Sequence, residues 1–151
     1  MMNVRNKIFS VLLALALALA LAGSFALAHQ SKEVGDGAYR VIVGYLVNPA
    51  YSGQINGIDL AIRNADNEPM LGLERSILAW VIAPDGTELQ LTLRANAAKE
   101  GWYTGNFIPT VSGNYTFRVS GFIGEIEFEE HFDEPAHSDP AVLDGASIRV
   151  P

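Results

Sequence analysis

The chain contains no cysteine among its 151 residues. Disulfides and a lipid-modified cysteine anchor are therefore excluded, and the fold must be stabilised by packing and backbone hydrogen bonds. Soft thiolate ligands for Cu(I) are missing as well. Met70 is the only methionine after the first two residues, so a thioether site for Cu(I) is not expected either.

The familiar catalytic motifs are also missing. The sequence has no Gly-x-Ser-x-Gly, no glycine-rich phosphate loop and no His-Glu-x-x-His. It has no Asp-x-Asp-x-Asp-Gly loop, so the acidic residues between 125 and 134 favour a solvated face over a calcium site. We therefore expect a protein that is not an enzyme.

Positive charge is scarce. The chain has 10 Lys and Arg against 17 Asp and Glu, and two of the basic residues, Arg5 and Lys7, lie near the N-terminus. Without these two, 8 basic face 17 acidic residues, a formal charge of about −9. Such a surface repels nucleic acid and anionic membranes and attracts cations, so we expect no nucleic-acid partner.

Only one long apolar run occurs, the 21 residues from Ile8 to Ala28. It follows Arg5 and Lys7 and ends in Ala26-Leu27-Ala28, the three-part pattern of a secretory signal peptide cleaved after Ala28. We therefore assign residues 1–28 as a signal peptide and expect a secreted, periplasmic or cell-envelope protein. The alternative is an uncleaved membrane anchor, because about 20 apolar residues can span a bilayer.

The remaining chain is rich in strand-like alternation, most clearly over residues 101–121. Tyr103 and Phe107 alternate with polar residues, and Tyr115, Phe117 and Val119 do so again after a turn. This period of two predicts a pair of half-buried antiparallel strands on which the other strands pack. Tyr115 follows a turn glycine and suits the tyrosine corner of a β-sandwich.

Other segments alternate in the same way, and no convincing long helix is present. The stretch 77–82 is apolar on both faces and is interpreted as a central strand buried on both sides, while the Glu row of 125–132 suits a sheet edge. The further predicted strands are 39–48, 58–62 and 88–94.

About seven strands at this spacing predict an all-β antiparallel sandwich over residues 39–132. We expect residues 29–38 to form an N-terminal leader without a regular element. Residues 133–151 should form a C-terminal tail, in which 146–150 could pair weakly as a last strand.

The pattern Gly101-x-Tyr103-x-x-x-Phe107-x-Pro109-x-x-x-Gly113-x-Tyr115-x-Phe117 resembles the immunoglobulin-like sandwiches of YtkA-like and CopC-like exported proteins. The resemblance covers about residues 39–132 and implies an immunoglobulin-like fold. CopC-like proteins are periplasmic copper binders that use the histidine at the mature N-terminus and a later Asp-x-His pair. His29 would match the first, whereas the chain offers His-x-Asp at residues 131–133 and 137–139, in the reverse order.

His29 is the strongest candidate for a metal ligand. As the first residue of a mature chain it would supply an amine and a ring nitrogen, and one more imidazole would complete a tetragonal nitrogen site for Cu(II). His131 is the preferred second ligand because it is expected to face outward near a strand end. His137, in the tail, and the carboxylate of Asp133 complete the predicted ligand set. The alternative is that these are ordinary surface residues.

Two functions therefore stay open. The first is an exported metal-handling protein of the cell envelope that binds copper(II). The second is an immunoglobulin-like interaction or structural module that binds an envelope protein without metal or catalysis. The distance between His29 and His131 discriminates between them, because a binding site requires the two to lie side by side.

Overall fold

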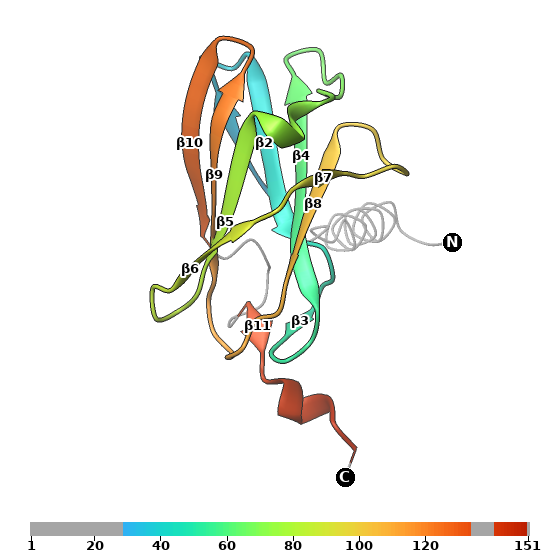
Figure 1. Ribbon diagram of the computed structural model, residues 1–151, viewed down its shortest axis with the longest axis vertical. Helices are drawn as coiled ribbons and strands as arrows, with labels where there is room; N and C mark the ends of the chain where they lie inside the picture. The colour runs from blue at the N-terminus through green and yellow to red at the C-terminus, as the bar shows by residue number, and fades with distance from the viewer. Residues whose placement is uncertain (1–28, 134–140, 151) are drawn as a thin grey trace, which may run out of the picture.

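The computed structural model describes residues 29–133 and 141–150, which form an immunoglobulin-like antiparallel β-sandwich (Figure 1). This confirms the predicted fold class. One sheet has five strands in the order β1 (His29–Val34), β2 (Tyr39–Tyr45), β4 (Asn56–Asn64), β8 (Trp102–Phe107) and β7 (Arg94–Ala95). The other has four strands in the order β10 (Ile126–Asp133), β9 (Thr116–Ile123), β5 (Ile77–Ile82) and β6 (Glu88–Leu91).

Short elements close the ends of the sandwich. β3 (Ala50–Tyr51) and β11 (Val142–Leu143) form a small parallel pair, and two 3-10 turns, η1 (Leu73–Arg75) and η2 (Gly145–Ile148), complete the described chain. Within that part of the chain, neither helical turn has the length and apolar character needed to cross a membrane.

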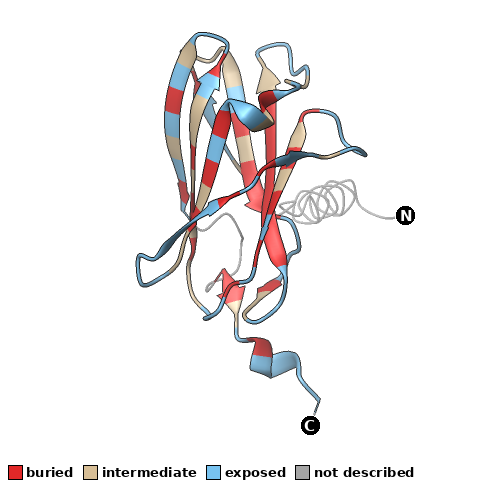
Figure 2. Cartoon of the chain, in the orientation of Figure 1, coloured by how far each residue is buried: buried red, intermediate tan, exposed pale blue. Residues whose placement is uncertain are grey.

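The core lies between the sheets and is lined mainly by alternate residues of β2, β4, β5, β8, β9 and β10 (Figure 2). Phe117 is wholly buried, and its ring lies 5.3 Å from that of Tyr45 and 5.9 Å from that of Phe107, both edge-on. Edge-to-face contacts of this kind favour aromatic packing beyond the area that they bury. The aromatic cluster therefore joins strands β2, β8 and β9 across the two sheets.

β8 and β9, the strands of the 101–121 stretch, do not pair with each other. β8 pairs with β4 and β7, and β9 with β5 and β10, so the connection through Pro109 crosses from one sheet to the other. The prediction of one antiparallel pair was wrong, because a period of two identifies the buried face of a strand and not its hydrogen-bonded neighbour. The predicted tyrosine corner is confirmed: the Tyr115 hydroxyl donates to the Val111 carbonyl at 3.1 Å.

β5 is central, between β9 and β6, but it is not buried on both sides. Leu78 on its outer face is 44% exposed. The strand with two buried faces is β4, whose residues 56–62 are all buried. It occupies the middle of the larger sheet, and its outward Asp59 lies beneath side chains from two neighbouring segments. β10 lies at a sheet edge, as its row of Glu residues predicted.

The segment predicted as a leader begins with strand β1. It pairs with β2 over all six of its residues, from His29 opposite Gly44 to Val34 opposite Tyr39. The polar sequence of this segment lacks the apolar alternation that predicts a strand. β1 is instead an edge strand held by backbone hydrogen bonds and by contacts to β10. Lys32 Nζ lies 3.0 Å from Glu130 Oε2, and Gln30 donates to the Asp133 carbonyl.

The described part of the predicted tail, residues 141–150, also forms regular elements. Val142 is fully buried and pairs with Ala50, while residues 145–148 form η2 and not a last strand. Asp144 caps this turn by accepting a hydrogen bond from the Ala146 N–H at 2.9 Å, which favours a helical start over an extended strand.

Two buried tyrosines give a matched test of the core. The Tyr103 hydroxyl donates to the Met70 carbonyl at 2.7 Å and accepts from the Leu73 N–H at 3.1 Å, whereas the Tyr45 hydroxyl has no partner among the described residues. We expect Tyr103→Phe to lower the free energy of unfolding by about 1–2 kcal/mol, and Tyr45→Phe to leave it unchanged or raise it. Urea unfolding measures both, and an equal loss for the two variants would contradict this account.

The same burial predicts a loss of stability at alkaline pH. Desolvation raises the pKa of Tyr45 strongly and is also the main cause that raises the pKa of Tyr103. In the unfolded chain a tyrosine loses its proton near pH 10. The contribution of the buried, neutral tyrosines to the free energy of unfolding is therefore complete below about pH 10, and it falls as the pH rises toward their pKa values in the folded state. Urea unfolding from pH 8 to 11 should show the fall, and Tyr45→Phe should make it shallower. If the free energy of unfolding falls as steeply with pH in Tyr45→Phe as in the wild type, Tyr45 is not a source of the fall.

Candidate functional site

His29 lies at the start of β1 and reaches across the next strand. Register places Gly44 of β2 opposite His29, and Asp59 of β4 opposite Gly44. Because glycine has no side chain, the imidazole lies over β2 and contacts the carboxylate of Asp59, with Nε2 3.1 Å from Oδ2. Three neighbouring strands therefore position this pair on the outer face of the larger sheet.

Asp59 is an unusual residue for the middle of a sheet. It is 5% exposed, and its Oδ1 atom has no hydrogen-bond partner among the described residues. Its other oxygen, Oδ2, also lies 4.0 Å from the ammonium of Lys99. A buried carboxylate is costly unless donors or cations satisfy it, so Asp59 has remaining capacity to interact with a positive group.

Lys99 and Trp102 complete the surroundings of the pair. The Trp102 ring meets the His29 ring edge-on, with centroids 5.5 Å apart and planes at 84°. Lys99 lies over the same indole, with its ammonium 4.6 Å from the ring centroid. Lys99 comes from the turn between β7 and β8, where the Trp102 N–H donates to the Lys99 carbonyl. We refer to His29, Asp59, Lys99 and Trp102 as the His29 cluster.

The contact between His29 and Asp59 determines what the imidazole can do. An ionised carboxylate accepts hydrogen bonds only, so Nε2 must carry the proton. In the neutral ring Nδ1 then keeps its lone pair and can bind a metal. A histidine that donates its second ring N–H to a carboxylate is the usual arrangement of metal-ligating histidines, because the carboxylate orients the ring and raises its basicity.

The other predicted ligands lie elsewhere. His131 and Asp133 face outward from β10 on the smaller sheet, where His131 Nε2 lies 3.7 Å from Glu129 and Asp133 accepts from the Thr116 hydroxyl at 2.8 Å. The structure does not bring them together with His29, which faces outward from the opposite sheet. His137 lies outside the described residues. Residues 29–133 and 141–150 contain no group of three or more His, Cys, Asp or Glu that could hold a metal ion.

Sequence reasoning missed Asp59, Lys99 and Trp102 as parts of this site. A weak signal was present, since Asp59 is the one polar residue in the run from Gly57 to Ile62. Its significance depends on the register of β1, β2 and β4, which brings residues 30 positions apart into contact. The alternation of a single strand carries no information about that register.

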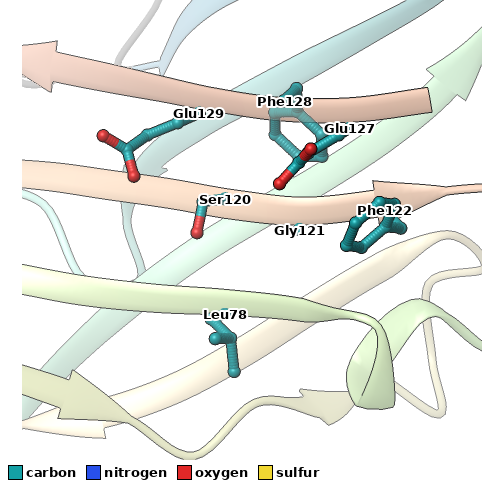
Figure 3. A pocket seen from close by; sticks show the side chains of 7 residues that line it. All are labelled: Leu78, Ser120, Gly121, Phe122, Glu127, Phe128 and Glu129. Atoms are coloured by element: carbon teal, nitrogen blue, oxygen red, sulfur yellow. The ribbon is translucent and has the colours of Figure 1, made fainter.

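A second feature lies on the outer face of the smaller sheet. A shallow groove of about 500 Å³ runs over β5, β9 and β10, and its apolar lining includes Leu78 and Phe122, which are 44% and 48% exposed (Figure 3). Glu127 and Glu129 border it along β10 (Figure 3). Ser120 of β9 also lines the groove and is the register partner of Glu129 of β10. The exposed apolar side chains suit contact with an apolar surface of a partner.

The tautomer of His29 can be tested directly by Asp59→Asn in the chain that begins at His29, which contains every described strand. The asparagine amide can donate to Nε2 as well as accept from it, so we expect the Nε2–H form to lose population to the Nδ1–H form. Ring ¹⁵N chemical shifts from long-range ¹H–¹⁵N spectra measure both forms. His131 serves as the internal control and should not change; an unaltered His29 ring would show that Asp59 does not set its tautomer.

No protein-family model matches the chain, and neither does any curated protein. Solved structures show likeness in fold. A DUF4426 family protein from Pseudomonas aeruginosa superposes with a TM-score of 0.53 at 13% identity, covering 70% of this chain and 92% of that one. A DUF4785 family protein from Legionella pneumophila gives 0.48 at 14% identity, covering 64% and 28%, and the Lin-41 filamin domain gives 0.41 at 19% identity, covering 60% and 89%. At 13% identity the similarity to the DUF4426 family protein shows the fold alone.

Proposed function

We propose that this protein is an exported, non-catalytic copper(II)-handling protein of the cell envelope, and that His29 holds the metal. The observation that carries the proposal is the hydrogen bond between His29 Nε2 and the buried carboxylate of Asp59, at 3.1 Å. It leaves Nδ1 as the ligand atom and orients the ring at the start of β1. The resemblance to CopC-like exported proteins, which use an N-terminal histidine, supports the same assignment.

The metal donors of the proposed site depend on cleavage of the signal peptide. Cleavage after Ala28 would make His29 the first residue, and its free amine and Nδ1 would then chelate one metal ion from a single residue. Two nitrogen donors in a tetragonal arrangement suit Cu(II), and the net negative charge of the mature chain favours a cation. His131 does not lie beside His29, so the two-histidine site expected from the sequence is not formed and the proposed site differs from it. It requires His29 alone, with Asp59 orienting it and other positions left for water or for a receiving partner.

The test is a Cu(II) titration, in competition with a chelator, of the chain that begins at His29. We expect one-to-one binding, weakened roughly 100-fold or more by one residue added before His29, because the extension removes the amine donor. Asp59→Asn should weaken binding about 10- to 100-fold, the usual effect of losing the group that orients a ligating histidine.

Two controls make this test specific. A peptide of residues 29–34 carries the same amine and ring but no Asp59, so it should bind about as weakly as Asp59→Asn. His131→Asn should bind like the wild type. Equal Cu(II) affinity with and without the added residue would contradict the proposal. Weaker Cu(II) binding by His131→Asn would support the ligand set expected from the sequence.

A second candidate is an immunoglobulin-like interaction module without metal. The groove on the smaller sheet favours it, because exposed Leu78 and Phe122 beside Glu127 and Glu129 form an apolar surface with an acidic border. Such a surface suits a protein partner that carries apolar and basic residues. Absence of copper binding in the titration would leave this as the better account of the protein.

A further inference from the structure

We infer that one end of the sandwich is a membrane-contacting surface, which lies on a lipid bilayer through uncharged apolar loops. This end is formed by the connections that follow β2 and β8, residues 46–55 and 108–115, near the short strands β3 and β11 (Figure 1). We refer to these two connections as the loop end. The inference goes beyond the proposed copper site and does not depend on it.

The two connections lie side by side in the folded chain. The Asn56 side chain donates to the Val47 carbonyl at 2.8 Å, and Asn56 is also the register partner of Phe107, so the ends of β2, β4 and β8 meet here. Beyond these strands the Gly53 N–H donates to the Pro109 carbonyl at 2.7 Å. The loop end is therefore one continuous surface, although its parts are about 60 residues apart in the sequence.

Large apolar side chains are exposed on this surface. They are Leu46 and Val47 after β2, Ile55 before β4, and Ile108 and Val111 after β8. Single exposed apolar residues are common on soluble proteins, but several on one surface indicate contact with an apolar partner or phase.

Charge is distributed unevenly between the two ends of the sandwich. Neither connection of the loop end contains a Lys, Arg, Asp or Glu. Asp85, Asp144 and Arg149 lie in neighbouring segments of the same end. The connections at the opposite end carry charge throughout, with Asp36, Asp66, Glu68, Glu74, Arg75, Lys99, Glu100 and Glu125. Because moving a charge out of water is costly, the loop end can enter the bilayer interface far more readily than the opposite end.

The position of the N-terminal segment favours a bilayer as the partner of the loop end. The apolar run from Ile8 to Ala28 ends directly before His29, and His29 pairs with Gly44, two residues before Leu46. Two residues of a strand span about 7 Å, so the sequence that is predicted to enter the membrane joins the domain beside the loop end. An uncleaved run would hold this end against the bilayer, and after cleavage the exposed loops supply the contact themselves.

The test is flotation of the chain that begins at His29 with phosphatidylcholine vesicles. We expect a lipid-bound fraction, and we expect the double variant Ile55→Ser, Ile108→Ser to lower the partition coefficient about tenfold or more. These two side chains are 67% and 57% exposed, so they supply much of the apolar area that reaches the lipid. Anionic lipid should weaken binding, because the chain after Ala28 carries a formal charge of about −9. Absence of binding to the vesicles would overturn the inference.

The double variant Leu71→Ser, Phe122→Ser is the matched control. These residues are 62% and 48% exposed, but they lie at the opposite end, Leu71 in the connection after β4 and Phe122 near the end of β9. The control should bind vesicles like the wild type. Equal losses in the two double variants would show that overall surface hydrophobicity, and not the loop end, causes binding, and would overturn the inference.

The orientation on the bilayer can be measured because the chain contains no cysteine. Ser112→Cys places one environment-sensitive fluorophore in the loop end, and Glu125→Cys places it in the turn between β9 and β10; both positions are exposed. Vesicles should shift the emission to shorter wavelength at position 112 and not at position 125. An equal or larger shift at position 125 would overturn the proposed orientation.

Sedimentation without lipid tests the other occupant of the loop end, a second copy of the chain. We expect the chain that begins at His29 to be monomeric. A dimer that Ile55→Ser, Ile108→Ser dissociates, together with no binding to vesicles, would assign the loop end to contact between two copies and overturn the inference.

Discussion

The burial of aromatic rings between the two sheets is the constraint on which this domain depends. Phe117 of β9 contacts Tyr45 of β2 and Phe107 of β8, so one side chain joins three strands from both sheets. With no disulfide available, this contact and the backbone ladders hold the sheets together. The outward faces of the strands are correspondingly free to carry polar and binding residues.

The outer face of the larger sheet carries an unusual pair of polar residues, Asp59 and His29. β4 lies in the middle of the sheet and carries an aspartate outward, and the neighbouring strand presents a glycine between this aspartate and His29. The site is therefore built by backbone register and not by a flexible loop. A side chain held on paired strands is better oriented than one on a free segment, so the fold itself orients His29.

The His29 cluster places a buried acid beside a cation. The carboxylate of Asp59 lies 3.1 Å from His29 Nε2 and 4.0 Å from the Lys99 ammonium, and the Trp102 indole lies against both basic side chains. The groove with the acidic border lies on the outer face of the other sheet and is a separate surface.

The sequence by itself determined the class of the fold and much of its outline. Alternation at Tyr103, Phe107, Phe117 and Val119 marked the buried faces, and Tyr115 marked the corner, because these depend on local period and turn chemistry. Tertiary structure alone decided which strands pair, that residues 29–34 form an edge strand, and that His29 meets Asp59 and not His131. The reason is physical: burial leaves a trace in each strand, whereas register and sheet membership arise from contacts between residues far apart in the chain, which alternation within one strand does not encode.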